Sequence, residues 1–357
     1  MAAAVQLLSV EALTAYVVAA GRAAGVPESQ VDLLAASFVE ADLRGVETHG
    51  VFRVPAYVRA FRQGRVNPAP NVSVVRDSGA ALLLDGDNGL GMVVGQIAMD
   101  RAIERAHEHG VGAVSVRNSN HSGMLAIHVL RAARRNLVGY FTSGGAAIMA
   151  AWGGSDPVLS NGPFAWGIPR EGAEPLVVDM SSSAAARGKI RSIAATRGRI
   201  PEGWALDGAG RPTTDSVAAM EGVVLPMAGH KGYGIALAND VVSSGLAGAN
   251  LAVEAPREFL KEGSTVLDAW GIGHFALVLD PAAFAGLPIF DSYVERLVAA
   301  IGNGRLAEGT TRVMLPGQPE AERRAERLAN GIPVPDRVLR LLDEFAEEIG
   351  IDPPARS

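Results

Sequence analysis

Residues 86–91 read Gly86-Asp87-Asn88-Gly89-Leu90-Gly91, and this stretch decides which kind of α/β fold the chain can form. It lies between an apolar run and a helical pattern, where a Rossmann fold carries its G-x-G-x-x-G fingerprint. The glycines here have a different spacing. No other segment combines G-x-G-x-x-G with a preceding strand and an acidic residue about 20 positions later. The sequence therefore predicts a fold that is not a Rossmann fold.

Upstream of this stretch the sequence has helical periodicity. Residues 8–24 form the first expected helix, with Ser9 as its N-cap and Gly25 as its stop signal. Two further helices are expected over 27–43 and 51–63. The pattern changes at Asn67-Pro68-Ala69-Pro70, so the first 65 residues are predicted to be mostly helical.

Downstream of residue 70, β-like runs alternate with helical patterns. The expected strands are Val72–Arg76, Ala81–Leu84, Ala113–Val116, Val138–Thr142, Phe164–Ile168, Leu176–Asp179, Gly222–Pro226 and Phe275–Leu279. The expected helices are Val93–His109, Met124–Arg135, Tyr233–Leu246, Ile289–Ile301, Glu320–Asn330 and Asp336–Ile349, the last capped by Asp336. We predict a mixed α/β domain over 76–299 and a helical domain formed by 1–75 and completed by 300–357.

The composition excludes several functional classes. The chain has 357 residues, of which 48% are hydrophobic and 20% charged, as expected for a globular protein with a large core. A net charge of −6 without a basic stripe argues against nucleic-acid binding. The absence of cysteine excludes disulfides and thiolate chemistry. No run is apolar enough to span a membrane, and the N-terminus lacks a signal-peptide pattern, so we expect a cytoplasmic protein.

The segment from Glu47 to Arg53 is the first candidate for chemistry. Histidine titrates near neutrality and arginine binds carboxylates through two hydrogen bonds, so His49 and Arg53 form a suitable pair. Residues four apart share a face of a helix, which should place these two side by side. Thr48 can hydrogen-bond the imidazole or a substrate. Alternatively, Thr48 only caps the following helix and His49 is a surface residue.

Three further turns carry candidate residues. Asn118–Gly123 places His121 after a predicted strand, at the exposed mouth of the sheet, where α/β enzymes hold active groups. Asp179–Ser183 offers N–H and hydroxyl groups for phosphate or ribose oxygens. Gly229–Gly234 precedes a helix whose N-terminus can bind an anion. Each turn can also be a capping or glycine-rich loop without a function.

Lysine is rare in this chain. Only Lys189, Lys231 and Lys261 occur among the 32 basic residues. A lysine ammonium can be tuned to give up a proton, whereas a guanidinium cannot, so the two lysines in glycine-flanked motifs are candidates for a specific task. The sequence has no H-E-x-x-H, no cluster of metal ligands and no G-x-S-x-G. We therefore expect no metal site and no serine-hydrolase chemistry.

Nine segments, in order, resemble the type-2 malate/L-lactate dehydrogenase family, which includes malate, sulfolactate and ureidoglycolate dehydrogenases, diketogulonate reductase and a cyclic-imine carboxylate reductase. They are Arg44–Val51, Asp87–Gly91, Asn118–Gly123, Ser160–Phe164, Val177–Ser183, Arg187–Ile190, Ile200–Asp215, Gly229–Gly234 and Leu315–Gln318. The resemblance extends from about Leu13 to Val334. A single segment is a weak signal, and nine in order are a strong one.

This resemblance implies a non-Rossmann fold, in which a largely antiparallel sheet holds NAD or NADP and helices from both chain ends form a second domain. It implies hydride transfer between NAD(P)H and a small 2-oxo acid, giving a 2-hydroxy acid of the malate, lactate or sulfolactate type. The substrate would be a small carboxylate. It also implies a homodimer, because the family pairs subunits across the active site.

The resemblance also assigns roles to residues. His49 matches the catalytic proton donor and acceptor, with Thr48 beside it, and Arg53 matches the substrate carboxylate ligand. His121 is similar to a second active-site histidine that some members use as the proton acceptor. The chemistry of a lysine ammonium, and not the resemblance, makes Lys189 a candidate for polarising the carbonyl. The matches to cofactor-contacting segments are Asp179, Met180, Ser181, His230, Lys231, Gly317 and Gln318.

The chain departs from the family pattern at three positions. Thr48 replaces the common serine and adds a methyl group, and Gln318 stands where many members have glutamate. Lys189 stands where the imine-reducing branch has aspartate, which favours a carbonyl substrate over a cationic imine. Four alternatives stay open: reduction of a cyclic imine carboxylate, a catalytically silent binding protein, NADH against NADPH, and which histidine donates the proton.

Overall fold

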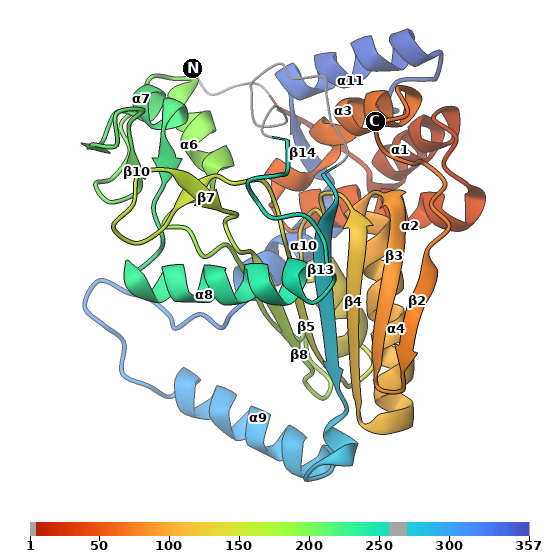
Figure 1. Ribbon diagram of the computed structural model, residues 1–357, viewed down its shortest axis with the longest axis vertical. Helices are drawn as coiled ribbons and strands as arrows, with labels where there is room; N and C mark the ends of the chain where they lie inside the picture. The colour runs from red at the N-terminus through yellow and green to blue at the C-terminus, as the bar shows by residue number, and fades with distance from the viewer. Residues whose placement is uncertain (1–4, 257–269, 357) are drawn as a thin grey trace.

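The computed structural model describes residues 5–256 and 270–356, and a seven-stranded sheet runs through its centre (Figure 1). In spatial order its strands are β2 (Ser73–Ser78), β3 (Ala81–Gly89), β4 (Val111–Ser119), β13 (Ile272–Leu279), β5 (Val138–Ser143), β8 (Phe164–Ile168) and β9 (Leu176–Met180). All neighbouring strands pair antiparallel except β3 and β4. The predicted mixed α/β class with a largely antiparallel sheet is confirmed.

The glycine-rich stretch 86–91 allows close packing between neighbouring segments of the chain. It joins the end of β3 to helix α4 (Gly91–His109), which crosses over to the parallel strand β4. A Cβ on Gly91 would lie 2.2 Å from the carbonyl oxygen of Asn120, and a Cβ on Gly89 would lie 2.6 Å from Pro70. These glycines therefore let neighbouring segments of the chain approach closely.

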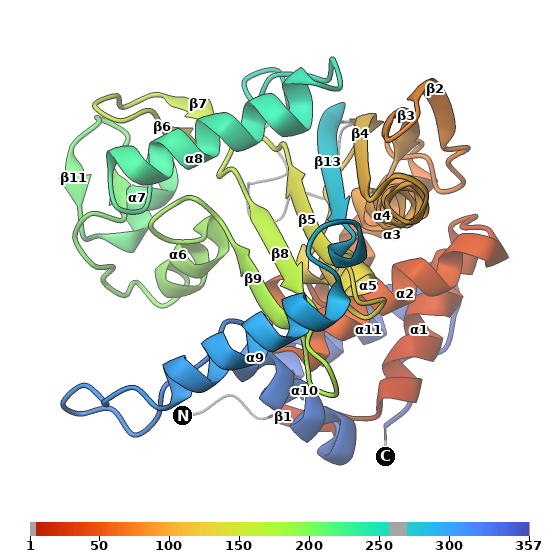
Figure 2. The same cartoon turned by 90° about the horizontal axis from the view of Figure 1, so that it is seen from below.

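Helices cover both faces of the sheet. On β5, Phe141 packs into the core that helices α4 and α5 (Ala126–Ala133) form with the sheet. The neighbouring Tyr140 donates a hydrogen bond to Asn239 of α8 (His230–Asp240) at 2.7 Å. Successive residues of a strand point to opposite faces, so α8 lies across the sheet from α5 (Figure 2).

The two ends of the chain form one helical layer. Strand β1 (Val5–Leu8) pairs antiparallel with β14 (Ile332–Pro335). Around this pair, one apolar core is shared by residues of the helices α1 (Val10–Ala23), α2 (Glu28–Leu43), α3 (Val54–Arg62) and α11 (Asp336–Ile349). The prediction that the two ends pack together is confirmed.

A second, five-stranded sheet has its own core. Its order is β11 (Pro212–Thr213), β10 (Ala205–Leu206), β12 (Val223–Val224), β6 (Met149–Ala150) and β7 (Pro157–Leu159). Helices α6 (Arg187–Ala194) and α7 (Ser216–Glu221) accompany it, and Ile190, Met149 and Val224 lie in its apolar cluster. The range 76–299 thus contains two sheets with separate cores, and the domain boundaries stay predictions.

Two helices near the C-terminal end are attached to the rest of the protein by ion pairs. Helix α9 (Leu287–Gly302) projects below the central sheet in Figure 1 and is tied to the body by the ion pair of Glu295 with Arg170. Helix α10 (Gln318–Asn330) packs against α2, where Arg324 donates to Glu40 at 2.9 Å. None of the helices in the two described ranges is long and apolar enough to cross a membrane.

Local details correct some of the expected boundaries. Ser9 caps α1 as predicted, accepting from Ala12 N–H. The prediction for Asp336 was wrong: Pro335 occupies the cap position, and Asp336 is the first helical residue. The helix expected over 51–63 begins with a short 3₁₀ turn, and its α-helical part starts at Val54. Lys261 lies outside the described residues.

Candidate active site

The turn that follows α2 carries Thr48 and His49. Residues 47–49 and 51–53 form two short 3₁₀ helices on either side of Gly50. The expectation that His49 and Arg53 share a face of one α-helix was therefore wrong. They are brought together differently: the Arg53 Nε–H folds back and donates to the carbonyl oxygen of Thr48.

Buried polar groups hold this turn in place. The N–H of Val51 donates to Asp42 Oδ2 at 2.8 Å, and a Cβ on Gly50 would lie 1.8 Å from Asp42 Oδ1. Arg327 of α10 donates to the carbonyl oxygen of Asp42 and to Glu47, the latter at 2.7 Å. Hydrogen bonds with residues of two helices, α2 and α10, thus hold the turn in place.

His121 lies beside this turn, in the loop between β4 and α5. Its neighbour Asn120 donates to the carbonyl oxygens of Asn88 and Gly89 and accepts from Trp270 N–H at 2.8 Å, which joins three segments. The edge of the Trp270 ring faces the His121 ring at a centroid distance of 6.1 Å. His121 is half-buried, where the sequence had suggested an exposed position.

The two histidine rings lie almost parallel. The centroids of His49 and His121 are 5.4 Å apart with an interplanar angle of 10°. Withdrawal from water and the charge of Arg53 lower the pKa of His49 to about 3. Withdrawal from water, His49 and Arg53 hold the pKa of His121 well below its usual value. Both imidazoles are therefore neutral at pH 7 in the free protein.

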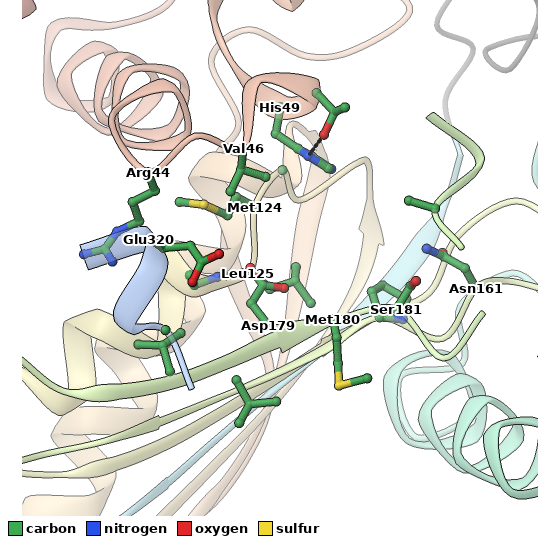
Figure 3. A pocket seen from close by; sticks show the side chains of 18 residues that line it. Arg44, Val46, His49, Met124, Leu125, Asn161, Asp179, Met180, Ser181 and Glu320 are labelled. Carbon is green, nitrogen blue, oxygen red and sulfur yellow. Dashed lines mark hydrogen bonds between the residues drawn. The ribbon is translucent and has the colours of Figure 1, made fainter. Parts of the chain in front are cut away.

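A cavity of about 490 Å³ opens next to His49 (Figure 3). Thr48 and His49 border it on one side, and β9 with the loop before α5 forms another wall. The full lining comprises Arg44, Val46, Thr48, His49, Gly123–Ala126, Asn161, Pro163, Val177–Ser181, Ala186, Gly317 and Glu320. Five chain segments that are distant in sequence thus meet at one cavity.

Asp179 closes the N-terminus of α5 at this cavity. Its carboxylate accepts from the N–H of Ala126 at 2.8 Å and from that of Leu125. The side chain is open toward the cavity but withdrawn from bulk water, which raises its pKa to about 6 against the effect of these hydrogen bonds. A carboxylate here satisfies the N–H groups at the start of α5.

The chain matches the family model described as malate/L-lactate dehydrogenase over residues 8–343. The chain belongs to this family. It is 35% identical over 329 residues to the L-sulfolactate dehydrogenase of Methanocaldococcus jannaschii, covering 92% of this chain and 93% of that protein. It is 35% identical over 341 residues to the (2R)-3-sulfolactate dehydrogenase (NADP(+)) of Chromohalobacter salexigens, covering 96% and 98%. The family resemblance in the sequence is confirmed.

Solved structures of the family agree with the fold. The malate dehydrogenase of Pyrococcus horikoshii superposes with a TM-score of 0.89 at 30% identity, over 98% of this chain and 97% of that one. The delta1-piperideine-2-carboxylate reductase of Pseudomonas syringae superposes with a TM-score of 0.83 at 27% identity, over 96% and 100%. The ureidoglycolate dehydrogenase (NAD(+)) of Escherichia coli O157:H7 is a relative at 29% identity, over 89% of this chain and 90% of that protein.

Of the twelve predicted site residues of this family member, six line the cavity, two lie beside His49 and four do not reach it. Thr48, His49, Asp179, Met180, Ser181 and Gly317 line it, and Arg53 and His121 adjoin His49. Lys189 does not line it, and its ammonium group lies over the ring of Trp204 at 5.1 Å.

The other predicted cofactor residues point elsewhere. His230 and Lys231 are exposed at the start of α8. The rings of His230 and Trp152 meet there in an edge-to-face contact. Gln318 accepts from Leu315 N–H at 3.0 Å and donates to Glu322 at 2.8 Å, so its amide stabilises the turn before α10. Within this chain these side chains do not reach the cavity.

Tyr57 was not among the site residues predicted from the sequence. Its hydroxyl lies 2.7 Å from His121 Nδ1, and the tyrosine is buried in the helical layer. The signal was present, because Tyr57 follows Arg53 by four residues, one helical turn, on the segment already singled out. Trp270 had no such signal, since it reaches His121 only through tertiary packing.

No group of three or more histidine, cysteine, aspartate or glutamate side chains that could hold a metal ion occurs among residues 5–256 and 270–356. The groups around the two histidines are two neutral imidazoles, the Arg53 guanidinium and the hydroxyls of Thr48 and Tyr57, next to the cavity.

Proposed function

We propose that this protein is an NAD(P)H-dependent oxidoreductase that interconverts a small 2-oxo acid and the corresponding 2-hydroxy acid, of the malate or sulfolactate type. The observation that carries the proposal is the position of His49 at the cavity, with Arg53 hydrogen-bonded to the neighbouring Thr48. The names of the relatives, which include sulfolactate and malate dehydrogenases, support the same substrate class.

The cavity suits the nicotinamide end of a cofactor. Apolar side chains of Leu125, Val177 and Met180 form walls for a flat ring, and Asp179 offers a carboxylate acceptor for an amide group. Gly317 has a φ of +79°, and a Cβ on it would lie 2.8 Å from Val177, so a larger residue would clash with this wall. When bound, the nicotinamide supplies or accepts the hydride.

The pyrophosphate of the cofactor is anionic and is disfavoured near the carboxylate of Asp179 in the cavity wall. It therefore needs cationic partners elsewhere. His230 and Lys231 at the N-terminus of α8 are the proposed candidates, because backbone N–H groups and a lysine ammonium favour an anion. The relatives include an NADP(+)- and an NAD(+)-dependent enzyme, so we propose NAD or NADP without choosing between them.

The substrate is held and protonated by residues of the catalytic turn. Arg53 binds the carboxylate, because a guanidinium matches a carboxylate with two hydrogen bonds. An imidazole exchanges the proton at the substrate oxygen, and the low pKa of His49 leaves its ring unprotonated and able to accept a proton in the free protein. A bound anionic substrate raises that pKa, which prepares the imidazolium needed for reduction. Lys189 stays a proposal for polarising the carbonyl.

We also propose that two copies of the chain associate. Ile289, Tyr293, Leu297 and Ile301 are spaced four residues apart and form one exposed apolar stripe along α9. Helix α8 and its continuation expose Ile235, Leu237, Val241 and Leu246. Contiguous apolar surface of this kind is typical of protein interfaces, and a second copy is the occupant that the family resemblance implies.

The first test follows nicotinamide absorbance while NADH and NADPH are offered separately with a panel of 2-oxo acids and cyclic imine acids. We expect turnover of an oxo acid that carries a second acidic group. Turnover of imines alone would assign the protein to imine reduction. Absence of both turnover and cofactor fluorescence changes would contradict the proposal.

A further inference from the structure

Two hydrogen-bond donors converge on one nitrogen of His121. The Tyr57 hydroxyl oxygen lies 2.7 Å from His121 Nδ1, and the backbone nitrogen of Gly123 lies 3.2 Å from the same atom. A backbone N–H can only donate, so Nδ1 accepts and carries no proton. In a neutral imidazole the proton must then be on the other ring nitrogen, Nε2.

Tyr57 can only be a donor to His121 in this arrangement. Its hydroxyl accepts a hydrogen bond from the Arg53 guanidinium, which has no lone pair to offer in return. Burial raises the pKa of Tyr57 to about 12 although Arg53 opposes this, so the hydroxyl keeps its proton. The chain of donors therefore runs from Arg53 to Tyr57 and from Tyr57 to His121.

The tyrosine is rigidly held. It is 1% exposed and packs against Phe38 with a centroid distance of 5.6 Å. Its ring lies nearly parallel to that of His121, with centroids 6.1 Å apart and an interplanar angle of 21°. A buried ring with fixed neighbours keeps its hydroxyl at one point in space, which is what setting a tautomer requires.

The hydrogen bonds of His49 do not fix its tautomer. Its Nδ1 lies 3.0 Å from Thr48 Oγ1, and a hydroxyl can both donate and accept. When Nδ1–H donates to the hydroxyl, Nε2 has a free lone pair and can act as a base. After protonation both nitrogens carry protons, and Thr48 still accepts. His49 can therefore change its protonation state without losing its partner.

We propose that Tyr57 is a positioning residue that holds His121 in the Nε2–H tautomer, so that His121 donates a hydrogen bond to the substrate oxygen while His49 exchanges the proton. This rests on the proposed function. In reduction, the carbonyl carbon accepts the hydride, the proton of the His49 imidazolium moves to the carbonyl oxygen, and His49 becomes neutral. His121 gains and loses no proton, because its Nε2 already holds one.

The direct test is the tautomer of His121 in the full-length protein. ¹⁵N–¹H correlation spectra of imidazole-labelled protein distinguish a protonated from an unprotonated ring nitrogen, and His121→Asn assigns the signals. We expect an unprotonated Nδ1 and a protonated Nε2 at pH 7. A proton on Nδ1 would overturn the proposal.

The second test is Tyr57→Phe, with Tyr16→Phe as its matched control. Tyr16 is also buried in the helical layer, and its hydroxyl donates to the carbonyl oxygen of Leu342 at 3.1 Å, away from the histidines. Tyr57→Phe leaves only the longer 3.2 Å contact from the Gly123 N–H at His121 Nδ1. We expect it to raise the population of the Nδ1–H tautomer of His121 and to lower kcat roughly 10- to 100-fold, with KM for NAD(P)H unchanged. Tyr16→Phe should change neither quantity.

The two readouts separate this inference from the proposed function. The spectra need no substrate, so a protein that turns over no oxo acid can still show the predicted tautomer. If Tyr57→Phe leaves both the spectra and kcat as in the parent while oxo acids are reduced, the proposed function stands and the role of Tyr57 is refuted.

Discussion

Asp42 Oδ2 accepts the backbone N–H of Val51 at 2.8 Å, and both residues are buried next to the turn that carries His49. Burial is the main cause that raises the pKa of Asp42 to about 7, and Glu47 adds to it while the hydrogen bond from Val51 and the charge of Arg327 oppose it. A group that supports the catalytic turn thus titrates near neutral pH.

This relationship predicts a pH-dependent stability. In the folded state Asp42 keeps its proton up to about pH 7, whereas in the unfolded chain it loses the proton near pH 3.8, the ordinary pKa of an aspartate. Between these limits the folded state binds more protons, so the free energy of unfolding falls as pH rises, by at most about 1.4 kcal/mol per pH unit. Chemical unfolding at a series of pH values measures the slope.

Asp42→Asn provides the control for this slope. The amide oxygen can still accept the Val51 N–H, but the side chain no longer titrates. The contribution to the slope between about pH 4 and pH 7 should therefore disappear. An unchanged slope would show that the pH dependence comes from other groups.

Gly50→Ala should disrupt the catalytic turn. The new Cβ would lie 1.8 Å from Asp42 Oδ1, so the turn must move. A displacement of about 1 Å at reacting groups can cost about 100-fold in rate, and we expect kcat/KM to fall by that order. Steady-state kinetics on a variant with a native circular dichroism spectrum measures this.

The matched control is Gly188→Ala. Its Cβ would lie 3.6 Å from Thr48 Cγ2, which is an ordinary contact, at the same catalytic turn. This variant should retain activity close to that of the parent. Equal losses in the two variants would mean that the spacing between Gly50 and Asp42 is not the cause.

Arg53→Gln should weaken substrate binding selectively. Loss of a guanidinium partner of a partly buried carboxylate costs about 2–5 kcal/mol, so kcat/KM for the oxo acid should fall roughly 30-fold or more. The dissociation constant of NAD(P)H, measured by fluorescence, should stay the same. Arg59→Gln is the control, since Arg59 pairs with Glu348 on the surface. A weaker cofactor affinity in Arg53→Gln would contradict the assignment.

The low pKa of His49 predicts which reaction direction depends on pH. With a pKa of about 3 in the free protein, the imidazolium fraction falls tenfold for each pH unit between about pH 5 and pH 8. The kcat/KM for oxo-acid reduction should fall accordingly, whereas kcat/KM for hydroxy-acid oxidation should stay flat. A flat reductive profile and a rising oxidative one would place the pKa of the catalytic group above this range.

Leu297→Asp should dissociate the proposed dimer. Leu297 lies in the middle of the exposed apolar stripe of α9, and a carboxylate there would have to be buried in the interface. We expect the dimer dissociation constant to rise roughly tenfold or more. Ala299→Asp, an exposed position away from the stripe, should leave it unchanged. Light scattering over a range of concentrations distinguishes the two, and a monomeric parent protein would refute the interface.

The long elements were predictable because their periodicity is local. Helix α4 was expected over Val93–His109 and begins two residues earlier, and strand β8 was predicted at its observed bounds. The two-residue strands β6, β10 and β11 were missed, because so short a run has no period to detect. Strand β14 contains Pro333 and Pro335, which obscured its strand character, and only pairing with β1 reveals it.

The features of the site also fall into those that the sequence predicts and those that depend on tertiary structure. The sequence by itself determined the proposed catalytic turn, since Thr48, His49 and Arg53 lie within six residues, and it determined the family through ordered motifs. Only the tertiary structure decided that Tyr57 reaches His121 from a different layer, that Asp42 supports Gly50, and that Lys189 packs on Trp204. Short-range spacing fixes which groups share a turn. Which groups meet across turns depends on the packing of distant segments, and that packing sets the burial, the hydrogen-bond direction and the pKa on which the chemistry depends.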